Sequence, residues 1–197
     1  MATSYPDVYP NSENWQCIPN NQSFESELDG SEQTASLSGD KWAVSQTFGN
    51  VSKVDGNKLK AFVVSLRGKA GKALLVPFEA RDPQGTTNGT PVISGASQTG
   101  STLTTSNWAA NETVLMAGDY IETNGELKMI MADVVSDGGG LATLTFEPAL
   151  RTSPPDAQAI ITENPRCIMR LLDDEQASWQ LSVEKYYTLT LDWVEAY

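Results

Sequence analysis

The stretch KWAVSQTFGNVSKVDGNKLKAFVVSLRGKAGKALLVPF, residues 41–78, decides the fold. Its first eight residues alternate in polarity, which predicts a half-buried strand over Lys41–Phe48. A helix is predicted next, because apolar residues follow the i, i+3, i+4, i+7 spacing at Leu59, Phe62, Val63 and Leu66. The run ALLVPF at 73–78 predicts a short buried strand. We therefore expect the apolar stripe of the helix to pack on a sheet.

The ends of this helix carry capping signals. Asp55 or Asn57 can cap its start, and Gly68 can end it. Upstream, residues 1–40 are polar and predict short strands and loops.

A second unit begins after Arg81, where RDPQGTTNGTP is dense in turn-forming residues. Asn124-Gly125 is the preferred sequence of a two-residue hairpin turn. Short strands are predicted around it at 92–93, 113–116, 120–121, 127–132 and 141–146. After Pro155, strands are predicted at 159–162, 167–172 and 179–196, and we expect them to share a sheet with the strands before Arg81.

The expected fold is therefore mainly β. Residues 1–81 and 153–197 are predicted to form a discontinuous β-sandwich or barrel host domain with one helix. Residues 82–152 are predicted to form an inserted small β-barrel domain, OB-like in type.

Composition excludes several classes of function. The 197 residues contain 25 Asp and Glu, 13 Lys and Arg and no His, which gives a net charge of −12. Without His the chain lacks the Ser-His-Asp and Cys-His nucleophile systems and the usual zinc ligand sets. The acidic balance disfavours binding to nucleic acid and to anionic membranes, and no segment resembles a signal peptide or a membrane span. We expect no enzyme, no cofactor, no metal and no membrane partner.

Four short motifs look like sites and are better explained as turns. Gly68–Ala73 lacks the spacing of a phosphate-binding loop, and Asp137–Gly140 offers too few oxygen ligands for calcium. The carboxylates of 173–175, and the pair Asp119 and Glu122, are more simply solvated turn residues than a glycosidase pair. We assign no catalytic, cofactor-binding or metal-binding residue.

Trp108 stays open between two interpretations. It lies in a Ser-, Thr- and Asn-rich stretch that predicts a loop, where an exposed indole would stack on a sugar. Burial in a core or an interface is equally consistent with its sequence context. Glycan contact through Trp108 would make the chain a carbohydrate-binding module that recognises a host-surface glycan through the inserted barrel.

Charge is divided between two segments. Residues 41–81 contain eight basic residues against Asp55 and Glu79, whereas residues 82–152 contain eight acidic residues against Lys128 and Arg151. Both segments could simply be solvated faces. Alternatively, the basic helix region meets an acidic surface on a neighbouring subunit or on a tail tube, with Lys58, Lys60 and Arg67 as the candidate interface residues.

The sequence resembles the distal tail proteins of long-tailed, siphovirus-type bacteriophages. The resemblance is carried by LKAFVVSLRGKAGKALLVPF at 59–78, RDPQGTTNGTPVISGASQTGSTL at 81–103, VLMAGDYIETNGELKMIMADVVSDGGGLATLTFEPALRTSPP at 114–155, and a closing strand pair through 186–194. It does not extend to residues 1–40.

The resemblance implies a structural protein of the virion, located at the tail tip and assembled in the host cytoplasm. It implies a homo-oligomeric ring of six copies that joins the tail tube protein to the baseplate hub or tail-fibre proteins. In such a ring the discontinuous β domain forms the ring and the insert faces outward. DNA passes through the ring without being bound.

Overall fold

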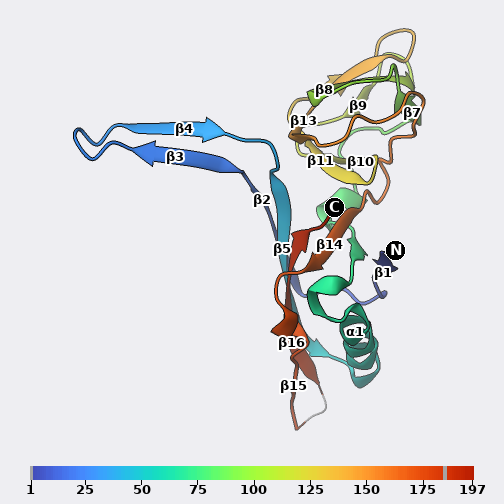
Figure 1. Cartoon of the computed structure of the whole chain (residues 1–197). Coiled ribbons are helices and arrows are strands. Elements are labelled where there is room, and N and C mark those ends of the chain that lie inside the picture. The colour runs from blue at the N-terminus through green and yellow to red at the C-terminus, as the bar shows by residue number, and fades with distance from the viewer. Residues whose placement is uncertain (1, 184–185) are drawn as a thin grey trace. The chain divides into compact units, whose positions relative to one another are not determined.

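The structure is a computed structural model that describes residues 2–183 and 186–197, and Figure 1 shows its elements. Strands dominate, which confirms the mainly-β prediction. Within the described residues one α-helix is present, α1 at Lys53–Leu66. Three short 3-10 helices lie at Gly68–Ala70 (η1), Glu79–Arg81 (η2) and Asp174–Gln176 (η3).

The chain divides into two compact units, and both are discontinuous in sequence. The first unit consists of Met1–Gln16, Trp42–Asp82 and Glu163–Tyr197, and the second of Cys17–Lys41 and Pro83–Thr162. These units differ from the predicted domains: residues 17–41 group with the second unit, and the junctions fall after Asp82 and Thr162 instead of after Arg81 and Thr152. The later junction has a physical cause, since Ala159 bridges to Val92 and Ile161 bridges to Glu122.

The first unit is built on one large sheet. Its strand order is β1-β6-β14-β16-β5-β2, and β15 pairs with β16. Strands from before and after the second unit thus share one sheet, as predicted for 167–172 and 179–196, whereas 159–162 forms only isolated bridges within the second unit. The strands are β1 (Thr3–Ser4), β2 (Ser12–Ile18), β5 (Lys41–Val51), β6 (Ala73–Leu75), β14 (Cys167–Leu171), β15 (Gln180–Leu181) and β16 (Tyr187–Glu195).

Helix α1 packs through the predicted apolar stripe, whose four residues are all buried. Gly56 is buried as well, and a Cβ there would lie 2.2 Å from Cδ2 of Tyr187 in β16, so only glycine permits this close approach. The cap differs from the prediction, because the Oγ of Ser52, not a side chain at 55 or 57, accepts a hydrogen bond from the backbone N of Asp55. Arg67, in the left-handed conformation, ends the helix.

The second unit contains a five-stranded sheet in the order β10-β11-β13-β8-β7 and a two-stranded sheet of β9 and β12. Side chains from these strands, including Leu103, Ile121, Leu144 and Phe146, form one buried cluster. The strands are β7 (Gly89–Ile93), β8 (Gly100–Trp108), β9 (Thr113–Leu115), β10 (Tyr120–Thr123), β11 (Glu126–Ile130), β12 (Val134–Val135) and β13 (Ala142–Leu150).

Strand β8 is the element that the sequence did not predict. Its Gly-, Ser- and Thr-rich sequence reads as a loop, yet β8 lies between β13 and β7 and pairs with both. The available signal was the alternation of buried Leu103 and Thr105 with exposed Thr102 and Thr104, because β-branched Thr is common in strands.

Candidate protein-interaction site

Two strands near the N-terminus form a hairpin that no other described residue covers. Strands β3 (Asn21–Glu25) and β4 (Glu32–Ser36) pair only with each other, from Asn21 opposite Ser36 to Glu25 opposite Glu32. All ten of their residues are exposed. Figure 1 shows them as a two-stranded ribbon. The strands of the β3–β4 hairpin therefore bury no side chain against the residues that the structure describes.

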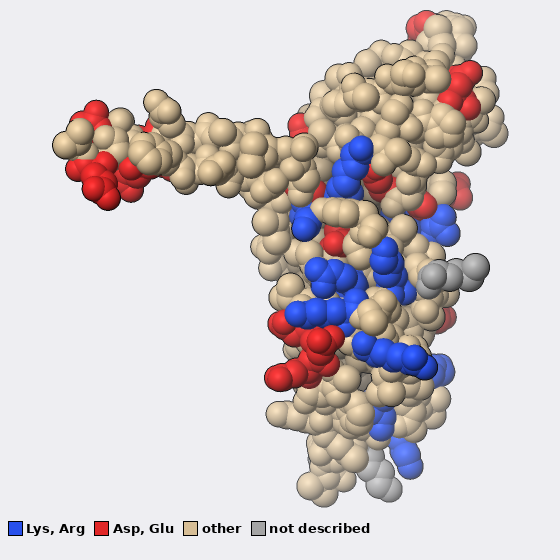
Figure 2. All heavy atoms as spheres, in the orientation of Figure 1, with Lys and Arg blue, Asp and Glu red and all other residues tan. Residues whose placement is uncertain are grey.

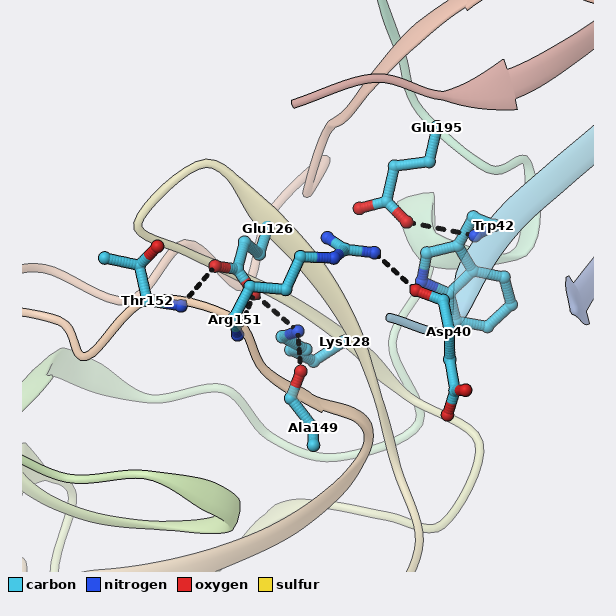
Figure 3. Close-up of polar contacts among 8 residues, drawn as sticks. All are labelled: Asp40, Trp42, Glu126, Lys128, Ala149, Arg151, Thr152 and Glu195. Carbon is cyan, nitrogen blue, oxygen red and sulfur yellow. Dashed lines mark hydrogen bonds and ion pairs between the residues drawn. The ribbon is translucent and has the colours of Figure 1, made fainter. Parts of the chain in front are cut away.

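Side-chain hydrogen bonds hold the base of the β3–β4 hairpin. The backbone N of Asn20 donates to Oδ1 of Asp40 at 2.7 Å, and Nδ2 of Asn20 donates to the carbonyl of Ser38 at 2.7 Å. Nη2 of Arg151 donates to the carbonyl of Asp40 at 2.6 Å, a contact drawn in Figure 3. The base is thus fixed by specific contacts, while the strands beyond it are exposed.

The end of the β3–β4 hairpin, residues 24–32, concentrates negative charge. Glu25 and Glu32 lie directly opposite each other, and Glu27 and Asp29 lie in the loop between the strands. Residues 1–40 contain no Lys or Arg. Figure 2 shows these acidic side chains gathered at the end of the ribbon. Like charges in directly opposed positions destabilise a strand pair, so this end is poorly stabilised by its own contacts.

Hydrogen bonds keep one of these carboxylates ionised over a wide pH range. The hydroxyl of Ser26, followed by the backbone and hydroxyl of Ser31, lowers the pKa of Asp29 to about 2. Both the backbone N and the Oγ of Ser31 donate to Oδ1 of Asp29, at 3.1 and 2.8 Å.

Apolar side chains accompany the charge. Phe24 is 71% exposed and Leu28, in the loop, is 99% exposed. Acidic and exposed apolar side chains thus lie together at the end of the β3–β4 hairpin.

The three predicted interface residues, Lys58, Lys60 and Arg67, all lie on or next to α1 but differ in their surroundings. Lys58 is exposed and forms an ion pair with Asp55 at 2.9 Å. Nζ of Lys60 donates to the hydroxyl of Tyr187 at 3.2 Å and lies over the rings of Tyr187 and Trp179, at 4.4 and 5.1 Å from their centroids. Arg67 is exposed at the end of the helix. Lys60 is thus engaged within the chain, whereas Lys58 and Arg67 face solvent.

Helix α1 carries an excess of positive charge. The helix and its last capping residue carry Lys53, Lys58, Lys60 and Arg67 against a single acidic residue, Asp55. Val54 and Val64 on the same helix are 67% and 56% exposed. Figure 2 shows Lys and Arg side chains gathered on the visible face of the first unit.

After α1, the charge of Lys69 is partly neutralised by an acidic turn. Nζ of Lys69 forms an ion pair with Asp173 at 3.2 Å, and the backbone N of Lys69 donates to Asp174 at 2.8 Å. The acidic turn at 173–175 therefore packs beside η1, where its carboxylates have a structural partner. This position does not resemble a glycosidase pair.

Trp108 is buried, which favours the core interpretation of this residue over glycan contact. The residue is 4% exposed, and its Nε1 donates to Oγ1 of Thr105 at 2.8 Å. It belongs to the core of the second unit because β8 is a strand and not a loop. The glycan-contact interpretation loses the residue on which it rested.

The remaining carboxylates that resembled sites have structural hydrogen bonds. Asp119 accepts from the backbone N of Gln84, Gly85 and Met116 at 2.8–3.0 Å. Asp137 accepts from the backbone N of Gly139 and Leu141, both at 2.8 Å. Each carboxylate thus organises a turn. In the part of the chain that the structure describes, no group of three or more potential metal ligands is present, and no helix is long and apolar enough to cross a membrane.

The second unit contains a buried ion pair that no sequence pattern indicates. Nζ of Lys128, whose side chain is fully buried, lies 2.7 Å from Oε2 of Glu126 and donates to the carbonyl of Ala149 at 2.9 Å. Glu126 also accepts from the backbone N of Arg151 and Thr152, both at 3.1 Å, as Figure 3 shows. This network joins β11 to the end of β13.

Figure 3 also draws a contact of the first unit, in which Oε2 of Glu195 accepts from the backbone N of Trp42 at 3.0 Å.

Comparison of the sequence with protein-family models and with curated proteins finds no match.

Proposed function

We propose that the chain is a structural, non-enzymatic protein of a phage tail tip. It assembles with copies of itself into a ring, six-membered as the resemblance implies, that joins the tail tube to the baseplate or host-recognition apparatus. The observation that carries the proposal is the β3–β4 hairpin, because all of its strand residues are exposed in the single chain.

The physics of hairpins explains why this observation favours assembly. A two-stranded hairpin is at best marginally stable in water unless other elements cover it. Here opposed glutamates weaken the pair further, and exposed apolar side chains gain nothing from the chain itself. A neighbouring copy supplies the missing cover. A cyclic ring requires two different complementary surfaces on each subunit, and an extended hairpin is well suited to be one of them.

The charge of the chain suits a ring through which DNA passes. The second unit contains thirteen acidic and three basic residues, a formal charge of −10, and the first unit contains twelve acidic and ten basic residues, a formal charge of −2. Neither unit carries a net positive charge, so neither favours holding the phosphate backbone of a passing DNA.

The carbohydrate-binding alternative is not proposed. Glycan contact requires an exposed Trp108, and this residue is buried.

Measurement of mass in solution tests the proposal. Light scattering and native mass spectrometry of the full chain, alone and with its tail tube protein, should show a closed ring. A shortened variant, in which Asn-Gly replaces residues 22–35, loses only exposed strand residues and the loop between them. We expect this variant to unfold cooperatively like the wild type and to remain monomeric.

Two outcomes contradict the proposal separately. A wild-type chain that stays monomeric in both conditions would exclude the ring. A shortened chain that still forms the ring would show that the β3–β4 hairpin does not carry assembly.

A further inference from the structure

We infer that the end of the β3–β4 hairpin of one copy docks on the outer face of α1 in a second copy. The hairpin end consists of residues 24–32, and the outer face consists of Lys53, Val54, Lys58, Ala61 and Val64. The inference deepens the proposed function and rests on it, because it requires copies of the chain to assemble.

The two surfaces are opposite in charge. The hairpin end carries Glu25, Glu27, Asp29 and Glu32 and no cation. The outer face of α1 carries Lys53 and Lys58, and Asp55 is the only acidic residue of the helix. That carboxylate already accepts hydrogen bonds from Nζ of Lys58 and Oγ of Ser52, both at 2.9 Å. Asp55 and Lys58 therefore largely neutralise each other, and Lys53 supplies the net positive charge of the outer face.

The two surfaces also share exposed apolar side chains. Phe24 and Leu28 on the hairpin end are 71% and 99% exposed, and Val54 and Val64 on the helix are 67% and 56% exposed. Docking would remove apolar area from water on both sides and place carboxylates beside lysines around it. An apolar centre with a charged rim is the usual arrangement of a protein interface.

Other basic positions fit the hairpin end less well. Lys60 is held against Tyr187 and Trp179, and Lys69 is already paired with Asp173. The acidic turn at 173–175 would repel a second acidic segment near η1. The outer face of α1 toward its N-terminal end has no such acidic neighbour on the helix apart from Asp55.

A second copy is the partner that this pair of surfaces favours. Each chain exposes one hairpin end and one outer helix face, so the contact repeats from copy to copy and can close into a ring. The same contact cannot be satisfied by a nucleic acid, because the hairpin end repels phosphate.

Charge reversal in the full-length chain tests the inference. In Lys53→Glu/Lys58→Glu, the concentration at which half of the chains are assembled should rise about tenfold or more, and the effect should shrink as salt increases. Lys53→Glu places an acidic residue in the first turn of α1, where the helix dipole favours it, so folding is retained.

A matched control separates this contact from a general effect of charge. Lys72→Glu/Arg81→Glu changes the charge of the first unit by the same amount at residues outside α1. Lys72 donates to the carbonyl of Tyr197, and Arg81 lies over the rings of Tyr9 and Phe78. This variant should assemble like the wild type. Adding Glu25→Lys/Glu32→Lys to Lys53→Glu/Lys58→Glu should restore assembly.

The outcomes distinguish the inference from the proposed function. If the wild type assembles and the two charge-reversed variants assemble equally well, docking on α1 is wrong while the ring remains. If the wild type is monomeric with and without its tube partner, the proposed function itself is wrong. If both reversed variants lose assembly equally and the added lysines do not restore it, the contact is not specific to α1 and the inference is overturned.

Discussion

Two hairpins of similar size in this chain are stabilised in opposite ways. In β10–β11, all four residues of β10 are buried and four of the five residues of β11 are buried. In β3–β4, every strand residue is exposed. The β10–β11 hairpin obtains its stability from the core of the second unit, whereas the strands of β3–β4 bury no side chain against the described residues.

The sequences of the two turns reflect this contrast. Asn124 and Gly125 both have positive φ, 50° and 75°, as a tight two-residue hairpin turn requires. The β3–β4 loop spans residues 26–31, and its Ser, Glu and Asp side chains are solvated or bonded to one another. The buried hairpin thus has a short turn and buried faces, whereas the exposed β3–β4 hairpin carries its acidic and apolar side chains at its end.

The largest expected effect comes from breaking the buried ion pair of β11. Lys128→Met leaves the carboxylate of Glu126 buried without its cation, which should lower the free energy of unfolding by about 3–5 kcal/mol. Denaturant unfolding measures this loss. The double variant Lys128→Met/Glu126→Gln should recover part of it, because the buried charge is removed. A loss below about 1 kcal/mol would show that the pair is not desolvated.

A pair of matched truncations compares the two hairpins directly. Ile121→Ala in β10 removes a fully buried side chain and should lower the free energy of unfolding by about 2–5 kcal/mol. Phe24→Ala in β3 should change it by about 0.5 kcal/mol or less in the monomer, because that ring is largely exposed. Both are measured by denaturant unfolding at a concentration where the wild type is monomeric. Equal losses of free energy would contradict the contrast between a buried β10–β11 hairpin and an exposed β3–β4 hairpin.

The smallest effect concerns the acidic loop. Hydrogen bonds from Ser26 and then Ser31 lower the pKa of Asp29 to about 2, below its ordinary value of 3.8. A depressed pKa means that the ionised carboxylate stabilises the folded loop, fully above about pH 4 and progressively less as pH falls through about 2. An NMR titration of the Asp29 carboxyl should give this midpoint, and Ser26→Ala should raise it toward 3.8. A midpoint near 3.8 in the wild type would contradict the loop geometry.

Local pattern was enough to predict most elements of the first unit and the tight hairpin of the second. The period-two alternation at 41–48 and the apolar stripe of α1 each reflect burial of one face, which sequence records residue by residue. The segregation of basic and acidic residues along the chain also follows from sequence alone. This segregation indicated that the α1 region is a candidate interface. It could not show that Lys60 donates a hydrogen bond to Tyr187.

Tertiary structure decided what local pattern could not. Strand β8 exists because β7 and β13 pair with it on both sides, and that pairing converts Trp108 from an apparent loop residue into a core residue. Lys128 reads as a solvated cation in sequence, but β11 turns it inward to meet Glu126. The exposure of β3–β4 is likewise a tertiary fact, because nothing in its composition states whether another strand will cover it. Sequence determined which residues favour strands, turns and charge, and long-range pairing determined which of them face water, since burial depends on contacts between residues far apart in the chain.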